Sequence, residues 1–412
     1  MSAEAAILVG AGAIFVVTVV SGRLERFWLT EPLVIMALGV ITGLTIVDPI
    51  ELDTPAILTV LELTLALVLF ADASRIDIAR LREGYSWPLR MLVMGTPLAI
   101  VIGAALAGWY LDFPLGPALL IGVILAPTDA ALAEPVLESR LVPPRVRETL
   151  NVESGLNDGL ALPALFIAIG IIESELGMGG GRVVWLVLGE LGVGIIGGIV
   201  IGWIGAIVIG RGAKQGWMNP LHQKIASVAL ALAGFAAVQL LGGSGFVATF
   251  IAGGLMSHLL RPDTEYLYQF AEAEGHSLVL VAFFIFGAAQ VAEMLRSGVS
   301  VEGLVFAGLS LFMVRPIAIG LSLLGQRLSA RTVAFFGWFG PRGLATIVFL
   351  LVAVEELDVI DGLLVEIVTF TVAASILLHG LSAIPASRWL SGMKLTEDMP
   401  EMGETFENPT RG

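Results

Sequence analysis

The stretch ETLNVESGLNDGLALP, residues 148–163, places two acids, an asparagine and a serine in a segment that otherwise resembles a membrane span. A carboxylate at the centre of a membrane helix costs about 2.5–3.5 kcal/mol on insertion scales, so such residues usually have a function. Glu153 and Asn157 are four residues apart and therefore share one face of a helix. Ser154 and Asp158 share a neighbouring face, about 100° away. One pair can thus meet a partner helix while the other faces a cavity.

The composition of the whole chain indicates an all-α polytopic membrane protein. Of its 412 residues, 57% are hydrophobic and only 14% are charged, and the mean hydropathy is +0.91. This balance excludes an ordinary soluble domain. The absence of cysteine excludes disulfides, thiolate metal sites and cysteine nucleophiles. The acids are scattered and no basic stripe exists, so we expect no nucleic-acid partner, and we expect no cofactor.

Apolar segments long enough to cross a bilayer number about thirteen, with the weakest boundary at Gly242–Gly243. They cover residues 5–22, 32–47, 56–72, 88–110, 115–137, 148–172, 183–210, 222–241, 244–259, 277–294, 300–324, 332–354 and 360–386. Lysine and arginine are concentrated in alternate loops, which become cytoplasmic if the N-terminus lies outside. Only Arg182 and Arg296 then fall in outside loops. We predict an outside N-terminus, a cytoplasmic C-terminus and a prokaryotic inner membrane.

Two of these segments are interrupted near their middle. Span five contains LAPTDAALAEP at residues 125–135, and span twelve contains GWFGPRGLAT at residues 337–346. Broken helices in corresponding halves of a chain indicate the midplane site of a secondary transporter. Spans one to six and eight to thirteen are therefore predicted to be inverted repeats on either side of span seven.

Asp129 and Asp158 are the two acids expected at midplane depth. Unwinding at Pro127 would free backbone carbonyls and Asp129 to coordinate a hard monovalent cation. Asp129 could instead cap the second half-helix, and the two roles are compatible. Asp158 has no such local structural role, and Ser154 is placed to bind a cation with it.

Glu153 needs a positively charged partner if it stays ionised in the interior. Arg315 in span eleven and Arg342 in the break of span twelve are the two intramembrane bases that could pair with it. Arginine keeps its proton at any relevant pH, so its partner stays ionised and Asp158 is left to titrate. The alternative is that this pair serves only as structural support.

Two further sets of residues have open roles. Asp72, at the inner end of span three, either pairs with Arg75 or reaches the cavity as a ligand. His222, His258 and His276 are predicted on the inner side, where their titration could respond to cytoplasmic pH.

Together these motifs resemble the monovalent cation/proton antiporters, in particular the NhaP-type and Na+/H+ exchanger branch. The carrying residues are Thr128-Asp129, Glu153-Ser154, Asn157-Asp158, Arg315-Pro316 and Gly340–Gly343. The resemblance covers nearly the whole chain, and its most specific part is the ES-x-x-ND motif following a TD-bearing span.

The resemblance implies a homodimer in which each protomer has a rigid dimerisation domain and a mobile core domain, built around the two broken helices, spans five and twelve, which cross each other. Residues 1–110 would supply dimerisation spans one to three and the start of the core. Residues 111–175 and 299–386 would complete the core, 176–298 would supply the linking span seven and further dimerisation spans, and 387–412 would form a short cytoplasmic tail.

For the site, the resemblance implies that Asp158 binds Na+ or H+ in turn. Thr128, Asp129 and Ser154 would add oxygen ligands, and Glu153 would pair with Arg315. An Asn-Asp pair, here Asn157-Asp158, is similar to the electroneutral branch. The chain departs from the family at Asp72, where a glutamate is frequent, and in FGPRG around Arg342, where GLRG is the commoner form.

We therefore predict a transporter, not an enzyme, that exchanges Na+ or Li+ for H+ in equal numbers by alternating access. A K+/H+ antiporter is the nearest alternative. From other classes, an intramembrane aspartyl protease using Asp129 and Asp158 would leave the broken helices and the arginines unexplained. A non-transporting membrane sensor is a further alternative.

Overall fold

The structure is a computed structural model that describes residues 3–24, 29–45, 55–75, 86–177, 186–260, 265–357, 360–392 and 401. Within these ranges all regular structure is helical, as predicted. Several loop bases behind the predicted topology lie outside the described residues, namely Arg26, Arg80, Arg82, Arg182, Arg261, Lys394 and Arg411. The same holds for nearly all of the predicted tail after Gly392.

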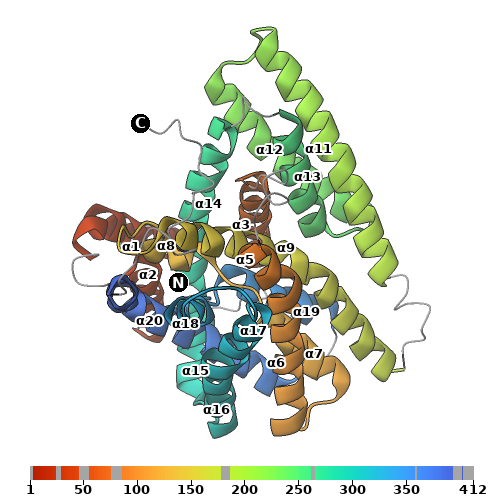
Figure 1. Cartoon of the computed structure of the whole chain (residues 1–412). Helices are drawn as coiled ribbons and strands as arrows, with labels where there is room; N and C mark the ends of the chain where they lie inside the picture. Colours follow the sequence, from red (N-terminus) through yellow and green to blue (C-terminus); the bar gives the residue numbers. More distant parts are fainter. Residues whose placement is uncertain are drawn as a thin grey trace.

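Among the described helices, eight are long and apolar enough to cross a membrane, and four shorter ones are also apolar. This confirms an integral, polytopic, all-α membrane protein, whereas the number thirteen stays a prediction. The first half contains α1 (Ala3–Leu24), α2 (Glu31–Thr45), α3 (Pro55–Arg75), α5 (Ser86–Arg90), α6 (Thr96–Tyr110), α7 (Leu115–Ile124), α8 (Ala130–Leu137) and α9 (Pro144–Glu175) (Figure 1).

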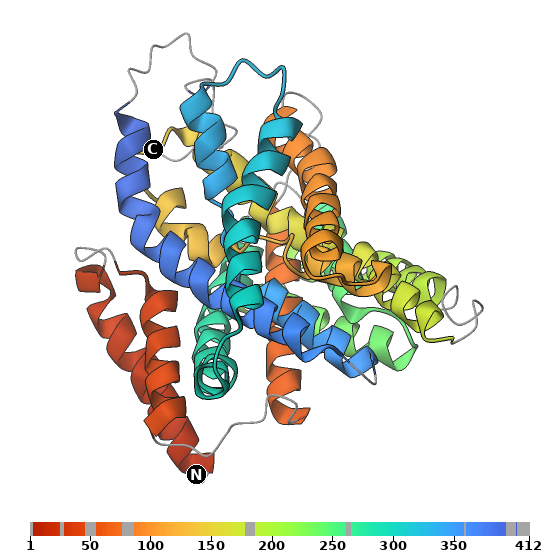
Figure 2. The same ribbon diagram turned by 90° about the horizontal axis from the view of Figure 1, so that it is seen from below.

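The second half continues with α11 (Leu191–Lys214), α12 (Pro220–Leu240), α13 (Gly245–Leu260), α14 (Glu265–Phe286), α15 (Ala292–Ser297), α16 (Val301–Leu309), α17 (Arg315–Ser322), α18 (Ala330–Trp338), α19 (Leu344–Glu356) and α20 (Gly362–Ser391). The helix ends near Gly242–Gly243 follow the predicted boundary, because Gly242 has a φ of +74° that terminates α12. The last helix runs diagonally across the molecule (Figure 2) and extends past the predicted end at residue 386. It accommodates Pro385 in its interior and is capped only at Gly392.

In the part of the chain that the structure describes, four short π-helical turns interrupt or extend the longer helices. They are η2 (Met91–Gly95), η3 (Leu186–Glu190), η4 (Gly287–Val291) and η5 (Ser310–Val314). The turn η5 joins α16 to α17 and ends directly before Arg315. A π-helical turn adds a residue to the helix and rotates the next helical segment, and such turns are frequent at functional sites. No feature of the sequence alone indicated these turns.

The two predicted breaks meet at one point in the structure. Residues 125–129 separate α7 from α8, and residues 339–343 separate α18 from α19. The backbone N–H of Asp129 donates to the carbonyl of Pro341 at 2.8 Å. Proline supplies no backbone N–H, so Pro127 and Pro341 help to leave the helical ladder open here. The broken helices therefore cross, as predicted, and we call residues 125–129 and 339–343 the crossing.

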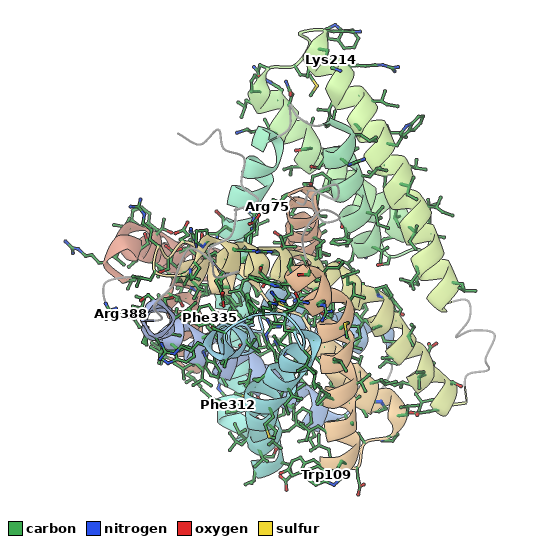
Figure 3. The ribbon with its side chains drawn as sticks, in the orientation of Figure 1. Arg75, Trp109, Lys214, Phe312, Phe335 and Arg388 are labelled. Atoms are coloured by element: carbon green, nitrogen blue, oxygen red, sulfur yellow. The ribbon has the colours of Figure 1, made fainter. Side chains whose placement is uncertain are left out.

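The surroundings of the crossing differ from the outer surface. The long helix α9 is largely buried and packs against α3, α7 and α8. Outside, large apolar side chains project from the ribbon, and Trp109 and Phe312 point outward in Figure 3 with exposed fractions of 78% and 56%. Such an apolar exterior suits contact with lipid acyl chains.

Candidate ion-binding site

The carboxylate of Asp129 joins the two half-helices that begin at the crossing. Its Oδ1 accepts hydrogen bonds from the backbone N–H groups of Ala131 at 2.8 Å and Leu132 at 3.3 Å, at the start of α8. Its Oδ2 accepts from the N–H of Leu344 at 2.8 Å, at the start of α19. Helix N-termini carry a partial positive charge and unpaired N–H groups, so one carboxylate stabilises both. Of the two roles predicted for Asp129, the structure displays the cap.

Gly343 allows this approach of the two half-helices. A Cβ at this position would overlap Oδ2 of Asp129. Gly340 plays the same part for Arg315, since a Cβ there would overlap its Nε. The GPRG sequence is therefore required by two close contacts with polar side chains.

We expect Gly343→Ala to lower the free energy of unfolding by about 1–3 kcal/mol, because the added methyl group overpacks a buried site. Thermal unfolding of the detergent-solubilised protein measures this. Gly320→Ala in α17 is the matched control, since its Cβ would meet no atom within 4 Å. Equal melting temperatures for the two variants would contradict the prediction.

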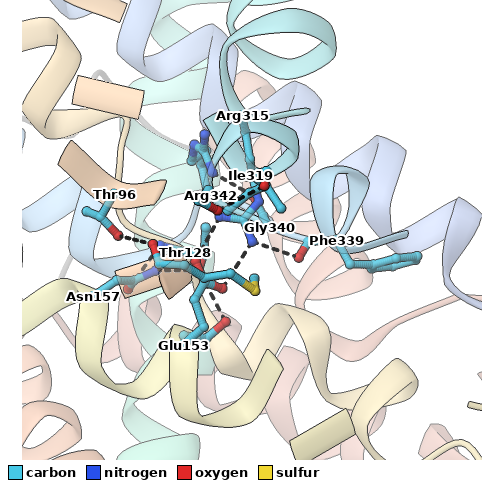
Figure 4. A network of polar contacts seen from close by, with 12 residues as sticks. Thr96, Thr128, Glu153, Asn157, Arg315, Ile319, Phe339, Gly340 and Arg342 are labelled. Carbon is cyan, nitrogen blue, oxygen red and sulfur yellow. Dashed lines mark hydrogen bonds and ion pairs between the residues drawn. The ribbon is translucent and has the colours of Figure 1, made fainter. Parts of the chain in front are cut away.

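Thr128 lies at the centre of a buried polar network that includes residues on both faces of α9 (Figure 4). Its Oγ1 accepts a hydrogen bond from Nδ2 of Asn157 at 2.6 Å, and its backbone N–H donates to Oδ1 of Asn157 at 3.3 Å. The same Oγ1 lies 3.3 Å from Oε2 of Glu153 and 3.1 Å from Oγ of Ser154. A threonine hydroxyl has one proton, so it can donate to only one of these two oxygens.

Glu153 and Arg315 form a bidentate ion pair. Nη1 of Arg315 donates to Oε1 at 2.9 Å and Nη2 donates to Oε2 at 3.0 Å. Their side chains are 1% and 6% exposed, so neither charge is solvated and each depends on the other. Nη2 of Arg315 also donates to the carbonyl of Phe339 at 3.1 Å, which ties the pair to the crossing.

Arg342 also lies at the crossing, but its described hydrogen bonds go to groups other than Glu153. Its Nη1 donates to the carbonyl of Gly340 at 2.7 Å, and its backbone N–H donates to Oγ of Ser375 at 2.7 Å. Of the two bases considered as partners for Glu153, the structure thus brings Arg315 to it. Arg342 instead links the crossing to α20.

A supporting cluster on α20 was missed by reasoning from the sequence. The ring of His379 stacks on Trp338 with centroids 4.9 Å apart, and its Nε2 lies 2.8 Å from the carbonyl oxygen of Trp338. Its Nδ1 lies 2.8 Å from the carbonyl oxygen and 3.1 Å from Oγ of Ser375. The sequence did contain one indication of it, because a histidine within the apolar segment that forms the 30-residue α20 is costly to bury without partners. This cluster positions the end of α18 beside the crossing.

Asp158 differs from the other acids at this depth. The residue is 5% exposed, and its Oδ1 has no hydrogen-bond partner among the described residues. Three other carboxylates, those of Asp72, Asp129 and Glu153, act on it electrostatically. A buried carboxylate with acidic neighbours needs a proton or a cation to offset its charge. These properties make Asp158 the candidate ion-binding group of this region.

Asp72 reaches this region from α3. A Cβ on Gly155 would lie 3.4 Å from the Cβ of Asp72, so the aspartate faces α9 one turn from Asp158. Its Oδ1 also lies 3.8 Å from Nη1 of Arg75. Both alternatives considered for Asp72 thus have a geometric basis. Phe250 of α13 packs against the same helix at Gly159, where an added Cβ would lie 2.5 Å from the phenyl ring.

The site therefore combines the carboxylate of Asp158 and its acidic neighbours with the hydroxyls of Thr128 and Ser154, and this polar network also includes the Glu153–Arg315 ion pair. Within the described part of the chain, no group of three or more histidine, cysteine, aspartate or glutamate residues could hold a metal ion. Hard monovalent cations take oxygen ligands of the kind found here.

The family model for sodium/hydrogen exchangers, transmembrane, matches residues 11–389. The chain belongs to this family. The members of this family are transporters.

Several individual proteins are similar to this exchanger-family chain. A protein of Alkalimonas amylolytica named K(+)/H(+) antiporter NhaP is 25% identical over 392 residues, which cover 92% of this chain and 66% of that protein. The chain thus spans slightly less than two thirds of the length of that relative. A protein of Pseudomonas aeruginosa named Na(+)/H(+) antiporter NhaP is 27% identical over 344 residues, with 78% of each chain covered.

The fold of this exchanger-family chain matches a solved structure. The sodium proton antiporter MjNhaP1 of Methanocaldococcus jannaschii superposes with a TM-score of 0.72 at 21% identity, covering 95% of this chain and 100% of that one. At this identity the match establishes the fold.

Proposed function

We propose that the protein exchanges Na+ or Li+ for H+ across a membrane, with Asp158 as the group that binds each in turn. The observation that carries the proposal is the buried Oδ1 of Asp158, which lacks a partner among the described residues. Membership in the sodium/hydrogen exchanger family supports it. Thr128, Ser154 and Asp129 are the proposed sources of further oxygen ligands, and Asp72 is the proposed contribution from α3.

The coupling needs no machinery beyond this one carboxylate. A carboxylate that holds either a proton or a cation, never both, links the two fluxes when the site faces each side in turn. Glu153 and Arg315 form an ion pair, so together they add no net charge. The partner of Asp158 in sequence is Asn157, whose amide is hydrogen-bonded to Thr128. One cation for one proton moves no net charge, so the exchange is electroneutral.

Of the two alternative functions, K+/H+ exchange is supported by an observation and proteolysis is opposed by one. K+ in place of Na+ is favoured by relatives named K(+)/H(+) antiporters, which cover 92% of this chain. An aspartyl protease would need Asp129 to share a water with Asp158. Both oxygens of Asp129 accept backbone N–H groups, which argues against that role.

We propose a homodimer in a prokaryotic inner membrane, with the N-terminus outside and the C-terminus in the cytoplasm. Residues 111–175 and 299–386 would form most of the mobile core, with the adjoining spans holding it in the dimer. Apolar outer surfaces such as that of α11 support contact with lipid or with a second copy.

The test is cation-induced fluorescence dequenching in proteoliposomes that hold an imposed pH gradient. We expect Na+ and Li+ to dissipate the gradient, with initial rates that do not change when valinomycin and K+ clamp the membrane potential. A response to K+ without any response to Na+ or Li+ would establish the K+/H+ alternative. A rate that follows the membrane potential would reject equal stoichiometry, and no response to Na+, Li+ or K+ would reject antiport. Protein-free vesicles are the control.

A further inference from the structure

His276 of α14 lies between carboxylates that come from two other helices. Its Nε2 is 3.5 Å from Oε2 of Glu31 on α2, and its Nδ1 is 3.9 Å from Oε2 of Glu134 on α8. The three side chains are 31%, 28% and 49% exposed, so the cluster is accessible to solvent protons. None of these three residues is among the proposed ion ligands. We call these three residues the latch.

The latch connects the tightly packed pair of helices α2 and α14 to helix α8. Helices α2 and α14 are tightly packed, since a Cβ on Gly39 would overlap the carbonyl oxygen of Phe284. Helix α8, in contrast, starts at the crossing and is capped by Asp129. The contact between His276 and Glu134 therefore connects α8 to the α2–α14 pair (Figure 1).

The protonation state of His276 decides whether both contacts can form. A neutral imidazole has one N–H group, so it can donate to only one of the two carboxylates. The imidazolium has two N–H groups and a positive charge, so it can bind both. Among the described residues, the charged groups that act on His276 are Glu31 from α2 and Glu134 and Asp129 from the α8 side, all of them acidic. From α3, apolar Val68 lies beside the neighbouring Gly275.

The position of the latch in the predicted topology indicates that it responds to the pH on the cytoplasmic side of the membrane. In the predicted topology, the start of α2, the end of α8 and the first half of α14 all lie on the cytoplasmic side. Histidine changes charge between about pH 5 and 8, which includes the cytoplasmic range. A fall in cytoplasmic pH would complete the bridge, and a rise would open it.

We propose that charged His276 latches α8 to α2 and α14 and thereby slows the movement of the crossing that transport requires. This rests on the proposed function, because a latch on α8 matters only if the crossing moves relative to α2 and α14. Any such movement must break the bridge between His276 and Glu134. The latch restrains exchange in acidic cytoplasm and releases it as the imidazole loses its proton.

The pH dependence of exchange in proteoliposomes tests the latch. We expect His276→Gln and Glu134→Gln each to move the acidic limb of the rate profile by about one unit toward lower pH, because the restraining bridge is gone. The double variant should move no further than either single one, since both remove the same contact. The matched controls are His258→Gln and Glu138→Gln, both at exposed positions, and their profiles should follow the unmodified protein.

A second measurement keeps the latch testable without transport. Hydrogen–deuterium exchange of α8 at pH 6 should be faster in Glu134→Gln than in the unmodified protein, and the two should agree at pH 8. Coinciding pH profiles, additive single effects, or an exchange difference independent of pH would each overturn the latch. An unmodified protein inactive toward every cation would reject the proposed function instead, and the exchange comparison would still decide the latch.

Discussion

Asp158→Asn is expected to reduce cation-driven proton movement to the level of protein-free vesicles while leaving the protein folded. An asparagine cannot carry the charge that attracts a cation, and it cannot take up or release a proton near neutral pH. The shape of the side chain is conserved, and Oδ1 has no partner to lose among the described residues. Initial rates of dequenching with Na+, Li+ and K+ measure the loss, and the melting temperature reports on folding.

Asp129→Asn is the matched comparison, because it makes the same chemical change at the other midplane aspartate. Asparagine is as good an N-cap as aspartate, so the bonds to α8 can persist. It has only one amide oxygen, however, so the N–H of Leu344 loses its acceptor, at a cost of about 1–3 kcal/mol. We expect Asp129→Asn to lower the melting temperature and Asp158→Asn to leave it unchanged. Exchange at the unmodified rate in Asp158→Asn would reject Asp158 as the ion-binding residue.

The sequence predicted the parts of this fold that depend on local chemistry. Prolines and glycines inside apolar segments indicated the two breaks, because they disfavour a continuous helix. Charged and polar residues at membrane depth stood out because their burial is costly. Their spacing placed Glu153 and Asp158 on different faces of one helix, so that one could pair with arginine while the other was left without a partner.

The parts that escaped prediction depend on contacts between distant segments. The second cap made by Asp129 involves Leu344, which is 215 positions away in the sequence. The choice of Arg315 over Arg342 as partner for Glu153 depends on a contact between residues 162 positions apart in the sequence. Nor did any pattern near His276 reveal that Glu31 and Glu134 would flank it, since each lies on a different helix.

The buried pair Glu153–Arg315 is expected to be essential for stability, and single and double variants can separate its contribution. Glu153→Gln leaves the Arg315 charge without a counter-ion, and Arg315→Met leaves the Glu153 charge in the same state. Each single change should cost about 3–5 kcal/mol of unfolding free energy, the usual result of stranding one buried charge. The double variant removes both charges, so its loss should be smaller than the sum, with a coupling of about 2 kcal/mol or more.

The surface pair Glu293 and Arg296 on α15 is the control for this cycle. Its N···O distance is 3.4 Å, and its side chains are 55% and 32% exposed. Solvent screens such pairs, so the cycle of Glu293→Gln and Arg296→Met should give a coupling of only about 0–1 kcal/mol. Equal couplings in the two cycles, measured by unfolding in detergent, would mean that Glu153 and Arg315 do not stabilise each other. Asp158 would then share its surroundings with an unneutralised Glu153, and the assignment of a single titrating carboxylate would fail with the pair.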